Sequence, residues 1–101
     1  MPNPIVLETA AAAELDPEPI PKDWILSGAP VATGKKLAKS WDLTSYVMVW
    51  DCTPGSFNWH YNKDETLVVL TGEVFISEGD GQERRLGPGD LAFFPGGTSA
   101  K

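Results

Sequence analysis

From Ser45 onward, hydrophobic and polar positions alternate in a pattern of short strands separated by turns. Residues 46–52 form an apolar run rich in β-formers, which ends at the turn sequence Thr53-Pro54-Gly55. Residues 57–61 alternate apolar and polar side chains, as expected for a strand with one buried face. Further strands are predicted, each followed by a turn that contains glycine or proline, at 66–70, 73–78, 82–86 and 91–94. Regular short strands of this kind predict an all-β sandwich or barrel.

The first 23 residues differ in composition from the rest of the chain. They hold five of the nine prolines and five acidic residues against one lysine, so they carry −4 of the formal net charge of −6. The run Ala10–Leu15, which begins with four alanines, allows about one or two helical turns, too few to be stable alone. Closely spaced prolines favour an extended, polyproline-like segment. We therefore expect an extended arm over residues 1–23 and one barrel domain over residues 24–101, with short strands and loops at 24–44 and a polar surface segment at 35–42.

Composition excludes several classes of protein. A chain of 101 residues fits one compact domain. The single cysteine, Cys52, excludes an internal disulfide and a cysteine-ligated zinc site, and predicts a reduced, buried thiol. No basic stripe is present, so we expect neither nucleic acid nor an anionic membrane surface as a partner. No apolar run spans a bilayer and no signal peptide is recognisable, so the expected location is the cytoplasm.

Two stretches carry a more specific pattern. Residues 55–72 read GSFNWHYNKDETLVVLTG, and residues 89–100 read GDLAFFPGGTSA. Together they resemble the two motifs of the cupin superfamily, which implies a double-stranded β-helix, or jelly-roll barrel. The aromatic-rich first motif is similar to that of small single-domain proteins of unknown function, of ureidoglycine aminohydrolases and of ethanolamine-utilisation cupin domains.

The resemblance also implies a metal site, which this sequence supplies only in part. Metal-dependent cupins resemble one another in a His-x-His pair, a following glutamate and a later histidine, a set that suits divalent first-row metals. Here Trp59, Tyr61 and Ala100 stand at the three histidine positions, and Glu65 alone remains. We therefore expect no metal ligands and no cofactor.

His60 lies between the two substituted positions. A shift of one residue would pair His60 with Asn62, but it leaves fewer residues before Glu65 than the family spacing requires. Successive residues of a strand point to opposite faces, so His60 is expected to face away from the interior. A metal ligand and a mobile catalytic group are the alternatives for this side chain.

Glu65 is the one candidate catalytic residue. Its carboxylate either holds a turn by hydrogen bonding near the barrel mouth or acts as an acid or base in an aromatic cavity, where burial perturbs the pKa. The predicted ligand-binding wall consists of Trp59, Tyr61, Leu67 and Val69. One of Phe93 and Phe94 and one of Met48 and Trp50 should add to this wall, but strand parity does not distinguish them.

The favoured function is the binding of a small molecule in this aromatic pocket without a tightly bound metal. The alternatives are a metal-dependent cupin enzyme of the aminohydrolase or dioxygenase type, and a non-catalytic oligomeric or structural subunit. The chain ends directly after the second motif, where similar proteins continue with a further strand. Either the sequence is truncated there or a partner chain completes the sheet, because an unpaired edge invites association. A homodimer is the expected assembly.

Overall fold

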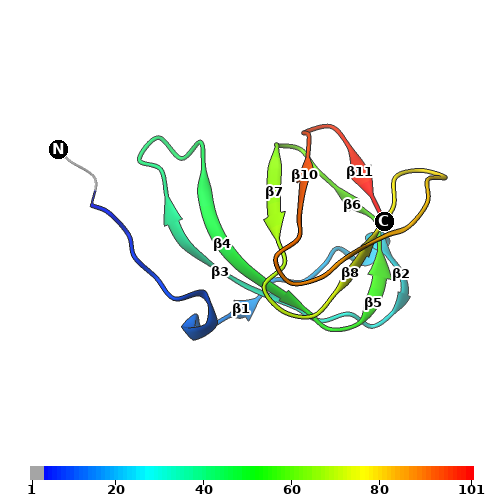
Figure 1. Cartoon of the computed structure of the whole chain (residues 1–101), viewed down its shortest axis with the longest axis horizontal. Helices are drawn as coiled ribbons and strands as arrows, with labels where there is room; N and C mark the ends of the chain where they lie inside the picture. Colours follow the sequence, from blue (N-terminus) through cyan, green and yellow to red (C-terminus); the bar gives the residue numbers. More distant parts are fainter. Residues whose placement is uncertain (1–3) are drawn as a thin grey trace.

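The structure, a computed structural model, describes residues 4–101 and confirms the predicted all-β class (Figure 1). Two short 3-10 turns, η1 (Ala10–Ala12) and η2 (Lys22–Trp24), are the helical elements of the described chain. The strands are β1 (Asp16–Pro17), β2 (Ile25–Gly28), β3 (Ala32–Lys39), β4 (Tyr46–Cys52), β5 (Gly55–Phe57), β6 (Trp59–His60), β7 (Glu65–Val68), β8 (Val74–Ile76), β9 (Arg84–Leu86), β10 (Leu91–Phe94) and β11 (Ser99–Ala100). Among residues 4–101, no helix has the length and apolar character needed to cross a bilayer.

All strand pairs are antiparallel. One sheet has three strands in the order β1-β3-β4, and the other pairs are β2-β5, β6-β11, β7-β10 and β8-β9. In Figure 1 the β3–β4 hairpin projects to one side, whereas strands β5 to β11 gather around the other end of the molecule. The β7–β10 and β6–β11 pairs join the two sequence motifs to each other.

The β3–β4 hairpin shows how the polar segment expected at the surface is built. Lys35–Lys39 form the outer half of β3 and pair with Tyr46–Val49 of β4, and the three lysines of this stretch are exposed. The backbone of β4 forms the hydrogen-bonded ladder with this segment, while the lysine side chains stay in solvent. Pairing with β4 therefore outweighs the weak intrinsic strand propensity of Lys35–Lys39. The Lys36 ammonium lies 4.6 Å from the centre of the Tyr46 ring, a cation–π contact across the two strands.

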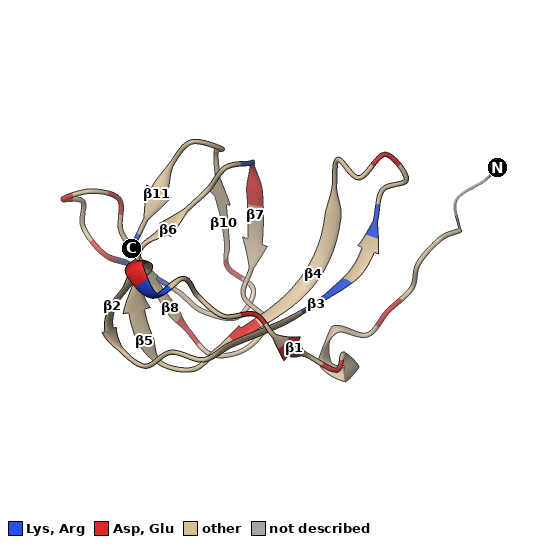
Figure 2. Ribbon diagram, turned by 180° about the vertical axis from the view of Figure 1, so that it is seen from behind, with Lys and Arg blue, Asp and Glu red and all other residues tan. Residues whose placement is uncertain are grey.

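The segment expected as an arm has two structurally different parts. Residues 4–9 are extended and exposed, whereas Asp16 and Pro17 form β1 against Gly34 and Thr33 of β3. The Asp16 carboxylate pairs with Lys35 at 3.5 Å, and Figure 2 shows acidic β1 beside basic β3. Ile20, which follows β1, is only 6% exposed. The second part of the arm is therefore paired with the sheet, and its residue Ile20 belongs to the core.

The buried apolar core is small for a chain of this size. Within the described residues it consists of Ile20, Ala32, Val69, Phe94 and Ala100. The accessible surface is 7895 Å². A compact monomer of 10.9 kDa would expose about 5,600 Å². Large apolar side chains, among them Val47, Leu70 and Leu91, account for part of the excess.

Replacing Ile20 tests whether the segment after β1 belongs to the core. We expect Ile20→Ala to lower the free energy of unfolding by about 2–4 kcal/mol, because it empties a buried site next to the three-stranded sheet. Urea unfolding at one fixed protein concentration measures this loss. Val31→Ala is the matched control, since Val31 is 61% exposed, and it should cost less than about 0.5 kcal/mol. Equal losses in the two variants would contradict the assignment of Ile20 to the core.

Candidate functional site

Two antiparallel ladders bring the two sequence motifs together. In the β6–β11 pair, Trp59 lies directly opposite Ala100, and in the β7–β10 pair Glu65 lies opposite Phe94. The positions that carry metal ligands in metal-dependent cupins therefore occupy adjoining strands here, as the motif spacing predicts. They are filled by other side chains.

The turn after β10 fixes the position of Tyr61. The Gly97 N–H donates to the Tyr61 carbonyl at 2.6 Å, and the Tyr61 N–H donates to the Thr98 carbonyl at 2.9 Å. Gly97 has a φ of 88°, a left-handed conformation that glycine adopts without steric cost. The glycine of the second motif thus serves the geometry of the turn that holds Tyr61.

Tyr61, Phe94 and Glu65 form the centre of the candidate site. The Tyr61 and Phe94 rings are stacked, with centroids 4.3 Å apart and planes inclined by 7°. Burial raises the pKa of the Tyr61 hydroxyl well above its usual range, and the negative charge of Glu65 raises it further. The phenol therefore remains protonated. Glu65 lies opposite Phe94 in the β7–β10 pair, and Phe94 stacks on Tyr61, so the three residues lie close together.

The Glu65 carboxylate is only partly shielded from solvent. The residue as a whole is exposed, but partial desolvation raises the pKa of its carboxyl from the ordinary value of 4.5. Within residues 4–101, its carboxylate oxygens have neither a hydrogen-bond partner nor an ion-pair partner. The turn-holding hydrogen bond to tyrosine or tryptophan that was one expectation for Glu65 is thus not formed in this part of the chain. The group is available to an N–H or O–H donor or a proton.

Trp59 belongs to a separate aromatic cluster. Its ring packs edge to face against Trp24 at 5.0 Å, Trp50 at 5.8 Å and Phe57 at 6.0 Å between centroids. The stacking partner of Tyr61 is Phe94, which lies outside this cluster. Trp59 and Tyr61 therefore pack in two different aromatic groups.

The structure shows which of the alternative residues on the neighbouring strands pack against Trp59 or Tyr61. Phe94 is 7% exposed and stacks on Tyr61, whereas Phe93 is 57% exposed on the opposite face of β10. Trp50 packs edge to face with Phe57 and Trp59 and so joins the Trp59 cluster.

The apolar residues expected on β7 lie beside Glu65. Leu67 is two residues beyond Glu65 and is paired with Ala92, so both face the same side of the β7–β10 pair as Glu65 and Phe94. Val69 continues this face and is buried. Glu65, Leu67 and Val69 thus share one surface, with the carboxylate at its more exposed end.

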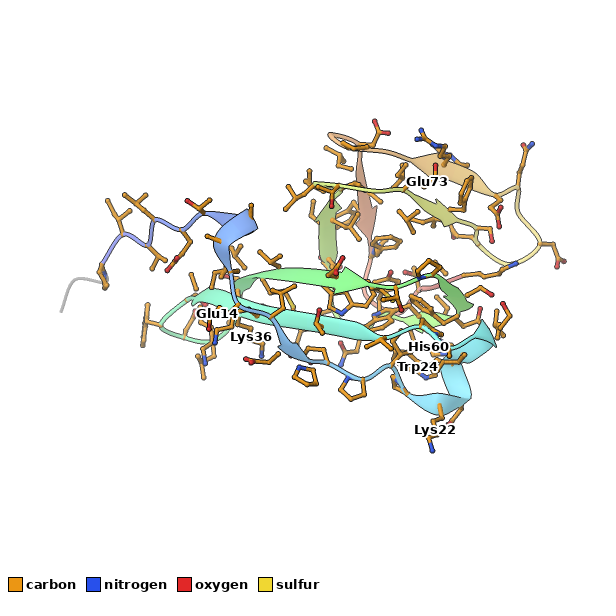
Figure 3. All side chains as sticks on the ribbon, turned by 90° about the horizontal axis from the view of Figure 1, so that it is seen from below. Glu14, Lys22, Trp24, Lys36, His60 and Glu73 are labelled. Carbon is orange, nitrogen blue, oxygen red and sulfur yellow. The ribbon has the colours of Figure 1, made fainter. Side chains whose placement is uncertain are left out.

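His60 is exposed and lies outside the Glu65 site. Its Nδ1 forms a 2.7 Å hydrogen bond with the Ser99 hydroxyl across the β6–β11 ladder. The Trp24 ring packs edge-on against the imidazole, with centroids 5.0 Å apart (Figure 3). Strand alternation points His60 away from the face that carries Trp59 and Ala100. Sequence reasoning did not find Ser99 and Trp24, because both come from distant segments and only the ladders bring them to His60.

The side chains present do not fit a first-row metal. Among residues 4–101, no three His, Cys, Asp or Glu side chains come close enough to hold an ion together. Trp59 and Ala100 offer no donor atom, and Tyr61 offers a phenol oxygen where metal-dependent cupins have an imidazole nitrogen. Glu65 remains as a single carboxylate.

A groove of about 320 Å³ lies elsewhere on the molecule. It is lined by Pro4 and Val6 of the extended arm and by the outer ends of β3 and β4 with the turn between them. None of the predicted site residues lines it.

Comparison with models of known protein families tests the cupin resemblance. The family model described as the EutQ-like cupin domain matches residues 40–101 and confirms the cupin resemblance inferred from the motifs. The comparisons with curated proteins and with solved structures found no match. The matched segment includes both motifs and every strand from β4 to β11. Because the match covers well over half of the sequence, the chain belongs to the EutQ-like cupin domain family.

Proposed function

We propose that this protein binds a small cationic amine at Glu65, against the stacked rings of Tyr61 and Phe94, without a resident metal ion. The observation that carries the proposal is the Glu65 carboxylate, which is partly desolvated yet has no donor partner within residues 4–101. A carboxylate in this state is stabilised by an incoming charged donor, because a charge-assisted hydrogen bond replaces lost solvation.

The aromatic surroundings favour a cation over a neutral or anionic ligand. A cation over an aromatic face gains about 0.5–2 kcal/mol, and the Tyr61–Phe94 stack lies next to the carboxylate. An anionic ligand would meet the Glu65 charge in a partly apolar environment and would be repelled. The Tyr61 hydroxyl, which stays protonated, adds a donor for a second polar atom of the ligand.

The same carboxylate is suited to proton transfer. Its raised pKa brings its protonation equilibrium closer to neutrality, which is the property required of a general acid or base. Should the bound amine react, Glu65 is the group that exchanges a proton with it, and Tyr61 and Phe94 orient it. The proposal for binding does not depend on such a step.

Replacing Glu65 by glutamine tests the charge of the site. We expect benzylamine, a cationic aromatic probe, to change the tryptophan fluorescence of the wild-type protein in a saturable manner, and benzoate, its anionic counterpart, to leave it unchanged. In Glu65→Gln the benzylamine affinity should fall at least about 10-fold, since the charge-assisted contact is lost. Its melting temperature at pH 7 should stay equal or rise slightly, because the variant no longer ionises a desolvated group.

The opposite pattern assigns Glu65 a structural role. If Glu65→Gln binds benzylamine as well as the wild type and also loses several degrees in melting temperature, the carboxylate stabilises the fold and the binding proposal is wrong. Glu73→Gln is the control, since Glu73 is ion-paired with Arg85 on another part of the surface and should leave benzylamine binding unchanged.

Binding should also depend on pH, and the titration of Glu65 determines the direction of the change. Benzylamine remains cationic from acid to neutral pH, so the titrating group is Glu65. The affinity should fall as the pH is lowered through the Glu65 pKa, with a midpoint above 4.5 because the pKa is raised. Fluorescence titrations at successive pH values measure this midpoint, and Glu65→Gln should show no such dependence. A midpoint below 4.5 in the wild type would contradict the partly desolvated carboxylate.

The donor set leads to a prediction for metal content. Protein purified without chelator and without added metal should contain far less than one iron, manganese, nickel or zinc ion per chain by elemental analysis, because Glu65 is the only suitable ligand at the family positions. A content of about one ion per chain would favour the metal-dependent alternative.

A further inference from the structure

Two turns meet beside the candidate site. Turn 62–64 connects β6 to β7 and turn 95–98 connects β10 to β11, and Figure 1 shows the two connections at the same end of these strand pairs. Tyr61 and Glu65 flank the first turn, and Phe94 directly precedes the second. The way in which the turns contact each other therefore affects how the two stacked rings and the carboxylate lie relative to one another.

Turn 95–98 is closed by its own hydrogen bonds. The Thr98 N–H and the Thr98 hydroxyl both donate to the Pro95 carbonyl, at 3.2 Å and 2.6 Å respectively. The proline ring also fixes φ at the first position of the turn. A turn restrained in this way moves as one unit, so a displacement of any of its residues also displaces Phe94.

The Asp64 side chain joins the two turns. Its Oδ1 accepts a hydrogen bond from the Gly96 N–H at 2.8 Å, across 32 residues of sequence. The backbones approach closely at the same place, since a Cβ on Gly96 would lie 3.1 Å from the Lys63 Cα and 3.2 Å from the Lys63 carbonyl carbon. The contacts of Tyr61 with turn 95–98 are backbone hydrogen bonds. A substitution of Asp64 therefore removes a link between the turns and leaves these backbone bonds in place.

The hydrogen bond from Gly96 to Asp64 lies between the groups of the proposed site. Asp64 directly precedes Glu65, and Gly96 is the second residue after Phe94. Once this bond is removed, the two turns keep their backbone contacts at Tyr61 and can pivot about them. A pivot changes the 4.3 Å separation of the stacked rings and shifts the carboxylate that follows Asp64. Ligand contacts require supporting hydrogen bonds of this kind, because small displacements weaken them.

We propose that Asp64 is a positioning residue for the ligand site. Its carboxylate holds the two turns together and thereby sets the geometry of the Tyr61–Phe94 stack next to Glu65. This inference rests on the proposed binding of an amine at that stack. Asp64 acts by accepting the Gly96 N–H and not through its charge, so an uncharged acceptor of the same shape should replace it.

Benzylamine titrations of matched variants test this role. In Asp64→Ala the affinity should fall about 5-fold or more, because the acceptor for the Gly96 N–H is lost. Asp64→Asn should bind within about 2-fold of the wild type, because its Oδ1 still accepts this bond. Titrations in about 0.3 M NaCl screen the charge difference between the two variants. Gly96→Ala should weaken binding as Asp64→Ala does, because its Cβ pushes the turns apart.

Asp42→Ala is the control for loss of an aspartate from a turn. Asp42 is exposed, like Asp64, and it accepts hydrogen bonds from Ser40 and Thr44 in the turn between β3 and β4. Its replacement should leave the benzylamine affinity unchanged.

A ligand-free measurement separates this inference from the proposed function. Tyr46 and Tyr61 are the two tyrosines of the chain, so a tyrosine-labelled sample gives two sets of ring signals in NMR spectra. The stacked Phe94 ring should shift the Tyr61 ring protons upfield in the wild type and in Asp64→Asn. In Asp64→Ala and Gly96→Ala these signals should move toward the shifts of free tyrosine. If the wild type fails to bind benzylamine, the proposed function is wrong, and the Tyr61 shifts alone decide the role of Asp64.

Three results would overturn the proposal. The first is an Asp64→Ala variant that keeps the Tyr61 shifts or binds benzylamine as tightly as the wild type. The second is an Asp64→Asn variant as weak as Asp64→Ala, which would indicate that the charge acts rather than the hydrogen bond. The third is an equal loss of affinity in Asp42→Ala, which would indicate a general loosening of the fold.

Discussion

Long-range strand pairing is the constraint on which both the fold and the candidate site depend. β6 pairs with β11 across 39 residues of sequence, and β7 pairs with β10 across the β8–β9 hairpin. Closing such loops costs chain entropy before any side chain is buried, and each pair is too short to be stable alone. The ladders therefore form together, and only then does Glu65 lie opposite Phe94 and Trp59 opposite Ala100.

Aromatic packing takes the place that metal coordination has in metal-dependent cupins. Trp59 is surrounded by edge-to-face contacts, and Tyr61 by a stacked ring, each worth about 0.5–1.5 kcal/mol beyond its area. The indole of Trp59 and the phenol of Tyr61 thus stand at positions where those proteins carry histidines, and neither supplies an imidazole nitrogen. What remains is one carboxylate beside a protonated phenol, an arrangement suited to a donor ligand.

The core is small, and several strands of the described chain pair along one edge only. Both features leave apolar surface exposed to solvent. The projecting β3–β4 hairpin and the β7–β10 pair each bury one face or one edge and leave the other exposed, which accounts for the large accessible surface. β7 connects this property to the site, since it carries Glu65 and, within the described chain, pairs only with β10.

The sequence by itself determined the features that depend on local pattern. The runs at 46–52 and 91–94 became β4 and β10 with the predicted bounds, because apolar β-formers between turn residues are recognisable within a few positions. The strand predicted at 57–61 is not continuous. Phe57 is the last residue of β5, which pairs with β2, whereas Trp59 and His60 form β6, which pairs with β11. The two motifs likewise identified the family, since their spacing is fixed by the turns between paired strands.

Only the tertiary structure decided which faces of these strands are covered. Lys35–Lys39 forms a strand because β4 lies beside it, and Ile20 is buried because β1 docks on β3. Phe94 rather than Phe93 joins the site, and Trp24 rather than any nearby residue packs on His60. The physical reason is that apolar and polar residues alternating along a strand show only that its two faces differ in polarity. Which of them is buried depends on segments that are distant in sequence and brought close only by the long-range ladders.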